Sequence, residues 1–178
     1  MIRTVVLGNA QPDFTANLFN QIDYKGFSLS FNFYVQWGNE IYDYVRYDEG
    51  DFNGSNQTPA RLIIQAAWEK PGDVTWVPKV PQARQLGNMR EISSIYIENG
   101  SFIRLRNARL TYRLNPSLTE RLKLDGLSLY VYGNNLLTWT NYFWFDPEIP
   151  LGSPLEMGID EGRSPRSRQV GLGINVNF

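Results

Sequence analysis

An alternation of apolar and polar residues between Phe27 and Gly38 constrains the fold of this chain more than any other feature. Side chains of a β-strand point alternately to opposite faces, so the segment has one apolar face. Its length suits the roughly 9–11 residues with which a tilted strand crosses a bilayer. A soluble sandwich core is the alternative, although it seldom needs so long a stripe. We predict that the stripe faces lipid. Its residues are Phe27, Leu29, Phe31, Phe33, Val35 and Trp37.

The C-terminal segment, residues 167–178, repeats the alternation and places an aromatic residue last. A transmembrane β-barrel has a use for such an ending, because its final strand faces lipid and closes against the first strand. Taken alone, the segment also fits a half-buried terminal strand of a soluble sandwich. We predict that its apolar residues form the barrel assembly signal. They are Val170, Leu172, Ile174, Val176 and Phe178.

Three further strands are predicted at residues 14–24, 102–114 and 127–137. The alternation breaks in the second of these, because Arg104 and Arg106 fall in the phase of the apolar Ala108. An arginine that faces lipid at mid-membrane costs about 2–4 kcal/mol. We therefore expect either that this part of the strand rises above the lipid or that a β-bulge near Asn107 shifts the phase.

The predicted connections alternate between short and long. Lys25-Gly26 fits a two-residue hairpin, and a short connection with a helical turn after Pro116 follows the third strand. The long connections cover residues 39–101, which include a helix expected to begin at Thr58, and residues 138–166. Short turns on one side and long loops on the other are typical of periplasmic and extracellular barrel ends. Five strands do not close a barrel, so we expect residues 1–178 to be the last strands of a larger antiparallel transmembrane β-barrel.

The composition excludes several functions. The chain has no cysteine and no histidine, which removes thiolate metal sites, cysteine nucleophiles and the commonest general base. The net charge of −1 gives no nucleic-acid footprint. The carboxylate pairs Asp146/Glu148 and Asp160/Glu161 invite a calcium or glycosidase interpretation, but such pairs are common in polar loops. We expect no enzyme activity, no metal and no cofactor.

Several blocks in the right order resemble the SusC/RagA family of TonB-linked outer-membrane transporters. The strongest are residues 96–107 and 132–140, and residues 8–14, 24–29, 38–42, 146–148 and the ending at Phe178 support them. The resemblance implies the C-terminal part of a barrel of about twenty-two strands with an N-terminal plug. It also implies import of oligosaccharides or peptides across the Gram-negative outer membrane. The TonB complex would act through an N-terminal part that is absent here, and a SusD-like surface lipoprotein would cap the barrel.

Candidate substrate-lining residues lie on the inward phase of the fourth strand and in the loop after it. Inward Tyr130, Tyr132 and Asn134 either line the substrate cavity or pack against the plug. Trp139, Tyr142 and Trp144 either contact ligand or lipoprotein, or pack within the loop. The competing function is a soluble antiparallel β-domain that binds carbohydrate through its loop aromatics. Membrane fractionation separates the two, because a soluble protein must cover the stripe that begins at Phe27.

Overall fold

The computed structural model describes residues 5–49, 61–75, 77, 79, 93–149 and 157–178. The chain divides into two compact units. The larger unit comprises Pro12–Gly38, Gly100–Glu148 and Ser164–Phe178, and the smaller unit comprises Met1–Gln11, Asn39–Asn99 and Ile149–Arg163. Within the described ranges, no helix has the length and apolar character needed to cross a membrane.

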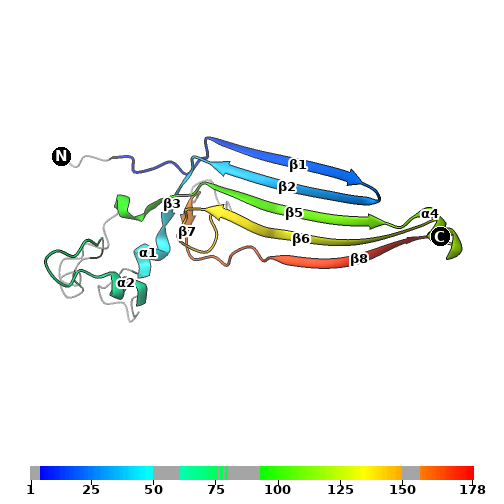
Figure 1. The fold of residues 1–178 in the computed structure, drawn as a ribbon. Helices are drawn as coiled ribbons and strands as arrows, with labels where there is room; N and C mark the ends of the chain where they lie inside the picture. The colour runs from blue at the N-terminus through cyan, green and yellow to red at the C-terminus, as the bar shows by residue number, and fades with distance from the viewer. Residues whose placement is uncertain (1–4, 50–60, 76, 78, 80–92, 150–156) are drawn as a thin grey trace. The chain divides into compact units, whose positions relative to one another are not determined.

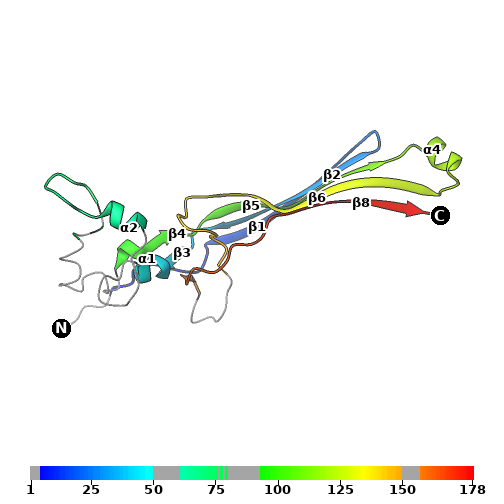
Figure 2. The same cartoon turned by 90° about the horizontal axis from the view of Figure 1, so that it is seen from below.

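The larger unit is a single antiparallel sheet whose strands follow one another up and down, in the order β1-β2-β5-β6-β8 (Figure 1). The turned view in Figure 2 shows the twist of this sheet. Its strands are β1 (Phe14–Tyr24), β2 (Phe27–Trp37), β5 (Phe102–Arg113), β6 (Gly126–Thr140) and β8 (Gln169–Asn177). β6 continues to Thr140, so residues 138–140 belong to a strand and not to the loop expected there.

The short connections have the local geometry that their residues favour. Lys25 and Gly26 both have positive φ, 44° and 87°, as a tight hairpin of type I′ requires. Helix α4 (Pro116–Arg121) follows β5, with proline in its first turn. The Asn115 side chain caps it by accepting a hydrogen bond from the Ser117 N–H. The helical turn predicted after Pro116 is therefore confirmed.

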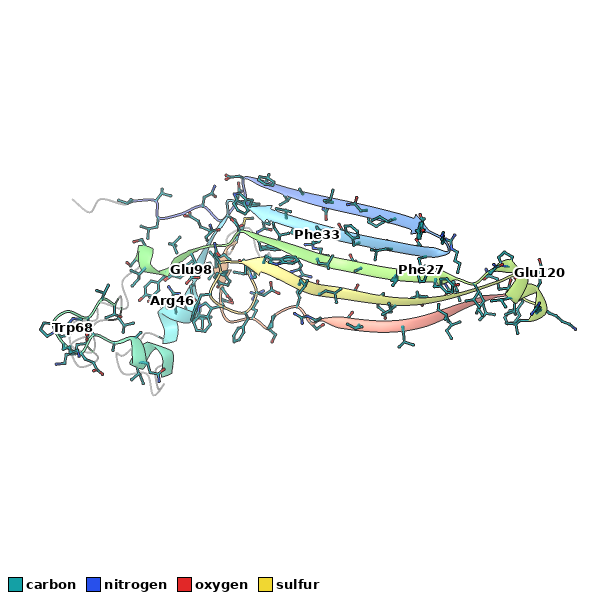
Figure 3. The ribbon with its side chains drawn as sticks, in the orientation of Figure 1. Phe27, Phe33, Arg46, Trp68, Glu98 and Glu120 are labelled. Atoms are coloured by element: carbon teal, nitrogen blue, oxygen red, sulfur yellow. The ribbon has the colours of Figure 1, made fainter. Side chains whose placement is uncertain are left out.

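The strand register collects the apolar residues on one face of the sheet. Tyr24, Phe27 and Tyr112 lie side by side on β1, β2 and β5 at the end with the short connections, here called the hairpin end. Phe33 lies farther along β2 (Figure 3). The face is open: Leu18 is 59% exposed and Leu172 is 85% exposed. An apolar face of this extent is unusual on a soluble monomer.

A β-bulge shifts the phase of β5. The β2–β5 register slips between Asn32 and Phe33, so Arg106 is the extra residue on β5 relative to β2. The β5–β6 register slips at the same place, where Asn135 and Leu136 of β6 lie opposite Arg106. Leu105 and Ala108 consequently share the apolar face, although three positions separate them. Arg104 moves to the opposite, polar face. The predicted bulge near Asn107 is confirmed, and it removes the conflict between the arginines and the apolar phase.

The smaller unit contains short elements in the region expected to be one long connection. A three-stranded sheet of order β4-β3-β7 joins β3 (Glu40–Asp43), β4 (Ile97–Asn99) and β7 (Ile159–Asp160). The helical elements are α1 (Tyr44–Glu49), α2 (Arg61–Ala66) and the 3₁₀ turn η2 (Ser94–Tyr96). A helix was expected from Thr58 onward; α2 falls inside that range, and Thr58 itself lies outside the described residues.

Tyr96 forms the centre of the smaller unit. Its side chain is fully buried, and the ring of Tyr47 packs edge-on against it, with centroids 5.6 Å apart. Burial raises the pKa of Tyr96 to about 12. Nearby, Arg46 pairs with the buried Asp43 at 3.3 Å and also with Glu98 (Figure 3). Aromatic packing and two partly buried ion pairs of Arg46 therefore hold this unit together.

Candidate functional site

The polar face of the five-stranded sheet carries the inward tyrosines. Tyr130 and Tyr132 lie in register with Gly173 and Gly171 of β8, and their rings cover these glycines. A Cβ atom at Gly171 would come within 2.6 Å of the Tyr132 ring. On β5, the Arg109 guanidinium lies 3.8 Å from the centroid of the Tyr130 ring. Tyr130 thus contacts both a glycine backbone and a guanidinium, which gives it a clear packing role on this face.

A row of side-chain amides crosses the polar face beside the bulge. Asn32, Asn107, Asn134 and Gln169 occupy successive register positions on β2, β5, β6 and β8. The Asn107 Nδ2 donates to Asn134 Oδ1 at 2.9 Å, and the Asn134 Nδ2 donates to Gln169 Oε1 at 3.2 Å. At the head of the row, Asn32 Oδ1 is buried and accepts no hydrogen bond from the described residues. An acceptor left in this state costs about 1–3 kcal/mol.

A hollow of about 380 Å³ lies over this row. Three amide residues (Asn32, Asn107 and Asn134) and three aromatic residues (Phe19, Phe31 and Tyr132) line it, together with Ser30, Ala108 and Arg109. Phe19 faces Asn32 across the β1–β2 pair and is 65% exposed. It is the apolar exception in the polar phase of β1. The hollow therefore combines neutral hydrogen-bonding groups with aromatic surface, as ligand sites commonly do.

Five charged side chains form an ion cluster at the end of the sheet opposite the hairpin end, where β5 begins and β6 ends. Arg104, only 2% exposed, donates to Thr138 Oγ1 at 3.0 Å and to Glu148 at 2.8 Å, and it pairs with Asp146. Glu148 also pairs with Arg106 at 2.7 Å and Arg166 at 3.1 Å. The Arg106 guanidinium stacks on Tyr34, 3.6 Å from the ring centroid. These contacts hold Asp146-Pro147-Glu148 against the polar face.

The aromatic residues predicted to lie in the loop after the fourth strand have different surroundings. Trp139 lies on β6 in register with Ile103 and near Phe33, so it belongs to the apolar face and not to the polar face of Tyr130, Tyr132 and Asn134. Tyr142 is buried at 5% exposure, whereas Phe143 is 59% exposed. The Trp144 ring packs edge-on against Phe143, with centroids 5.3 Å apart. The structure therefore does not bring the six predicted substrate-lining residues together.

The remaining acidic pair has local partners. Asp160 Oδ1 accepts from the Gly162 N–H at 2.9 Å, and Glu161 pairs with Arg163 at 3.5 Å. No group of three or more acidic side chains arranged for a metal ion occurs in the part of the chain that the structure describes. The sequence alone did not identify Phe19, Asn32, Asn107 or Arg109 as candidate site residues. Phe19 did give a signal, because it is an apolar residue in the polar phase of its strand.

Known proteins are similar to this chain in sequence and in fold. A TonB-dependent receptor of Formosa agariphila is 34% identical over 175 residues, which cover 97% of this chain and 17% of that receptor. A second TonB-dependent receptor of that organism is 32% identical over 179 residues, again covering 97% of this chain and 17% of the relative. The chain belongs to the TonB-dependent receptor family. No family model matches the chain.

Solved structures of TonB-dependent receptor relatives share its fold. The RagAB peptide importer in its closed-closed state gives a TM-score of 0.78 at 29% identity, covering 98% of this chain and 18% of that chain. Its open-open state gives a TM-score of 0.72 at 29% identity, covering 94% of this chain and 17% of that chain. This TonB-dependent receptor chain thus spans less than a fifth of its relatives' length, and its sheet is part of an outer-membrane β-barrel.

Proposed function

We propose that this chain forms part of the wall of a TonB-dependent outer-membrane transporter that imports oligosaccharides or peptides. Its apolar face would contact lipid, and its polar face would line the lumen. The observation that carries the proposal is the exposed apolar face of the five-stranded sheet, bounded by an aromatic row at each end. Tyr24, Phe27 and Tyr112 form one row, and Trp37 and Trp139 mark the other end.

The physical argument for lipid contact concerns the free energy of exposing apolar surface. Each large aliphatic or aromatic side chain left in water forfeits about 1.5–3 kcal/mol relative to burial. The exposed stripe residues Phe27, Leu29 and Trp37, together with Leu172 and its neighbours on β8, represent a penalty that a soluble chain would avoid by covering the face. Aromatic side chains with a polar tip, such as Tyr24 and Tyr112, favour the membrane interface. Lipid therefore suits this face better than water does.

The names of the solved relatives support a choice of substrate class and partner. Because the solved relatives are named peptide importers, peptides are the substrate class that we favour. A SusD-like surface lipoprotein would contact the loop aromatics, of which Phe143 and Phe145 are 59% and 69% exposed. The TonB complex would act through parts of the transporter outside this chain. Residues 39–101 and 141–166 would then lie on the extracellular side.

Two measurements on the intact transporter test this function. We expect outer-membrane fractions to contain it, with release only in detergent, and cells that carry it to accumulate labelled peptides in a TonB-dependent manner. The soluble carbohydrate-binding alternative predicts a detergent-free monomer that binds oligosaccharides. Recovery of such a monomer would overturn the proposal, and so would peptide accumulation that is unchanged when the gene is deleted.

A further inference from the structure

We propose that the hollow over the amide row is a binding site for the main chain of an extended peptide during import. This inference rests on the proposed function, since the hollow faces the lumen only if the apolar face contacts lipid. It goes further by assigning a binding site to the barrel wall. The lining residues that carry the argument are the amides of Asn32, Asn107 and Asn134 and the aromatic residues Phe19 and Tyr132.

Asn32 provides the hydrogen-bonding argument. Asn107 and Asn134 have their amides engaged along the row, whereas the Asn32 Oδ1 accepts nothing within the described chain. The χ2 torsion of asparagine is soft, so rotation of the amide would allow this oxygen to meet a donor in the hollow. A peptide N–H supplies such a donor. The ligand would thus satisfy an acceptor that the sheet leaves unpaired.

Phe19 provides the second, independent argument. On the polar face of β1 its neighbours in phase are Asn17 and Gln21, and all three point away from the apolar face. A phenyl ring that is 65% exposed there gains nothing from lipid. Aromatic anchors of this kind supply contact area for apolar parts of a ligand. In the hollow, Phe19 would pack against a side chain of the peptide whose main chain bonds Asn32.

The charge of the hollow favours a neutral main chain over an acidic ligand. Its lining includes three amides, and the one cation in the lining, Arg109, stacks on Tyr130 and donates to Thr111 Oγ1 at 3.3 Å. Its guanidinium is therefore already engaged. The bulge at Arg106 lies immediately beside the amide row, and bulges recur next to functional sites, where they re-aim side chains. The local backbone thus presents Asn107 to the hollow.

The test measures peptide import by the intact transporter with two substitutions and one matched control. Phe19→Ala and Asn32→Ala should each raise the peptide concentration for half-maximal import about fivefold, the equivalent of one net contact. Asn17→Ala, on the same face of β1 but outside the hollow, should change it less than about twofold. Import rates are normalised to the transporter assembled in the membrane, so that failed folding is separated from failed binding.

Photo-crosslinking identifies the occupant directly. With p-benzoylphenylalanine at position 19, we expect adducts with a labelled peptide that excess unlabelled peptide suppresses. Crosslinks only within the transporter, or adducts with an added oligosaccharide and none with peptide, would overturn the site. Normal import in both substituted transporters would also overturn it while leaving the proposed function intact. A native transporter that imports no peptide would instead overturn the peptide function and, with it, this occupant.

Discussion

Gly173 lies directly beneath the ring of Tyr130, so that a Cβ atom at Gly173 would come within 2.4 Å of the Tyr130 Cζ. The two residues are register partners on β8 and β6. Contacts between real Cβ atoms and ring carbons are never this short, and either the ring or the strand must move to admit a methyl group. The glycine thus leaves room for its cross-strand partner, and no turn is involved.

Gly173→Ala is therefore expected to destabilise the assembled transporter by about 1–3 kcal/mol, the usual cost of overpacking. The urea midpoint of unfolding, followed by tryptophan fluorescence, measures this loss. Tyr130→Ala is the matched background, because it removes the ring that the new methyl group meets. Adding Gly173→Ala to that background should cost little. An equal loss in both backgrounds would show that the conflict lies elsewhere.

Arg104→Met is expected to release the loop that Asp146 and Glu148 tie to the sheet. Removing one partner from a buried ion cluster typically costs about 3–5 kcal/mol, because the remaining charges lose their compensation. Lysine should not rescue the contact, since a single ammonium cannot serve Thr138, Asp146 and Glu148 as the guanidinium fork does. Chymotrypsin cleavage at the exposed Phe143 and Phe145 should accelerate about 10-fold or more.

Arg113→Met is the control for this measurement, because Arg113 lies on the same strand but is exposed and outside the ion cluster. It should leave the cleavage rate unchanged. If Arg104→Met and Arg113→Met behave alike, the ion cluster does not hold the loop.

Phe31→Arg is expected to reduce assembly into the membrane, and Ser30→Arg is not. The two residues are adjacent on β2 but lie on opposite faces, with Phe31 beside Ala108 and Ser30 beside Arg109. An arginine that faces lipid near mid-membrane costs about 2–4 kcal/mol, whereas one at position 30 lies on the polar face, where repulsion from Arg109 costs at most about 1 kcal/mol. Quantifying the transporter in outer-membrane fractions compares the two. Equal losses would refute the assignment of the faces.

The smaller unit should lose stability between about pH 10 and pH 12. Burial raises the pKa of Tyr96 to about 12, so the folded state holds the phenol proton more tightly than the unfolded state does. Above the ordinary tyrosine pKa of about 10 the unfolded state binds fewer protons, and stability falls as the pH rises through this window. The contribution is on the order of 2 kcal/mol.

This ionisation is measured by absorbance at the phenolate band as the pH is raised, taken as the difference between the native protein and the Tyr96→Phe protein. We expect one tyrosine to ionise last, close to pH 12, and the Tyr96→Phe protein to lack that step. Ionisation of this residue near pH 10 would contradict its burial.

The alternation of apolar and polar residues along each strand could be read from the sequence, because successive side chains of a strand point to opposite faces whatever the neighbouring strands are. The apolar phase of Phe27 to Trp37 and the hairpin at Lys25-Gly26 needed no knowledge of neighbouring strands. The break at Arg104 and Arg106 was also visible, and it led to the expected bulge. The fold class and the family resemblance rested on these local signals and on the spaced sequence blocks.

Register between strands was beyond the sequence, since it depends on pairings between residues far apart in the chain. Only the tertiary structure placed Gly173 under Tyr130, joined Arg104 to Glu148 and aligned Asn32 with Asn107 and Asn134. It also extended β6 far enough to put Trp139 on the apolar face. The sequence by itself thus determined which residues share a face of each strand. The pairing of the strands decided which of those residues meet, because a cross-strand contact depends on register and on bulges that alternation alone does not encode.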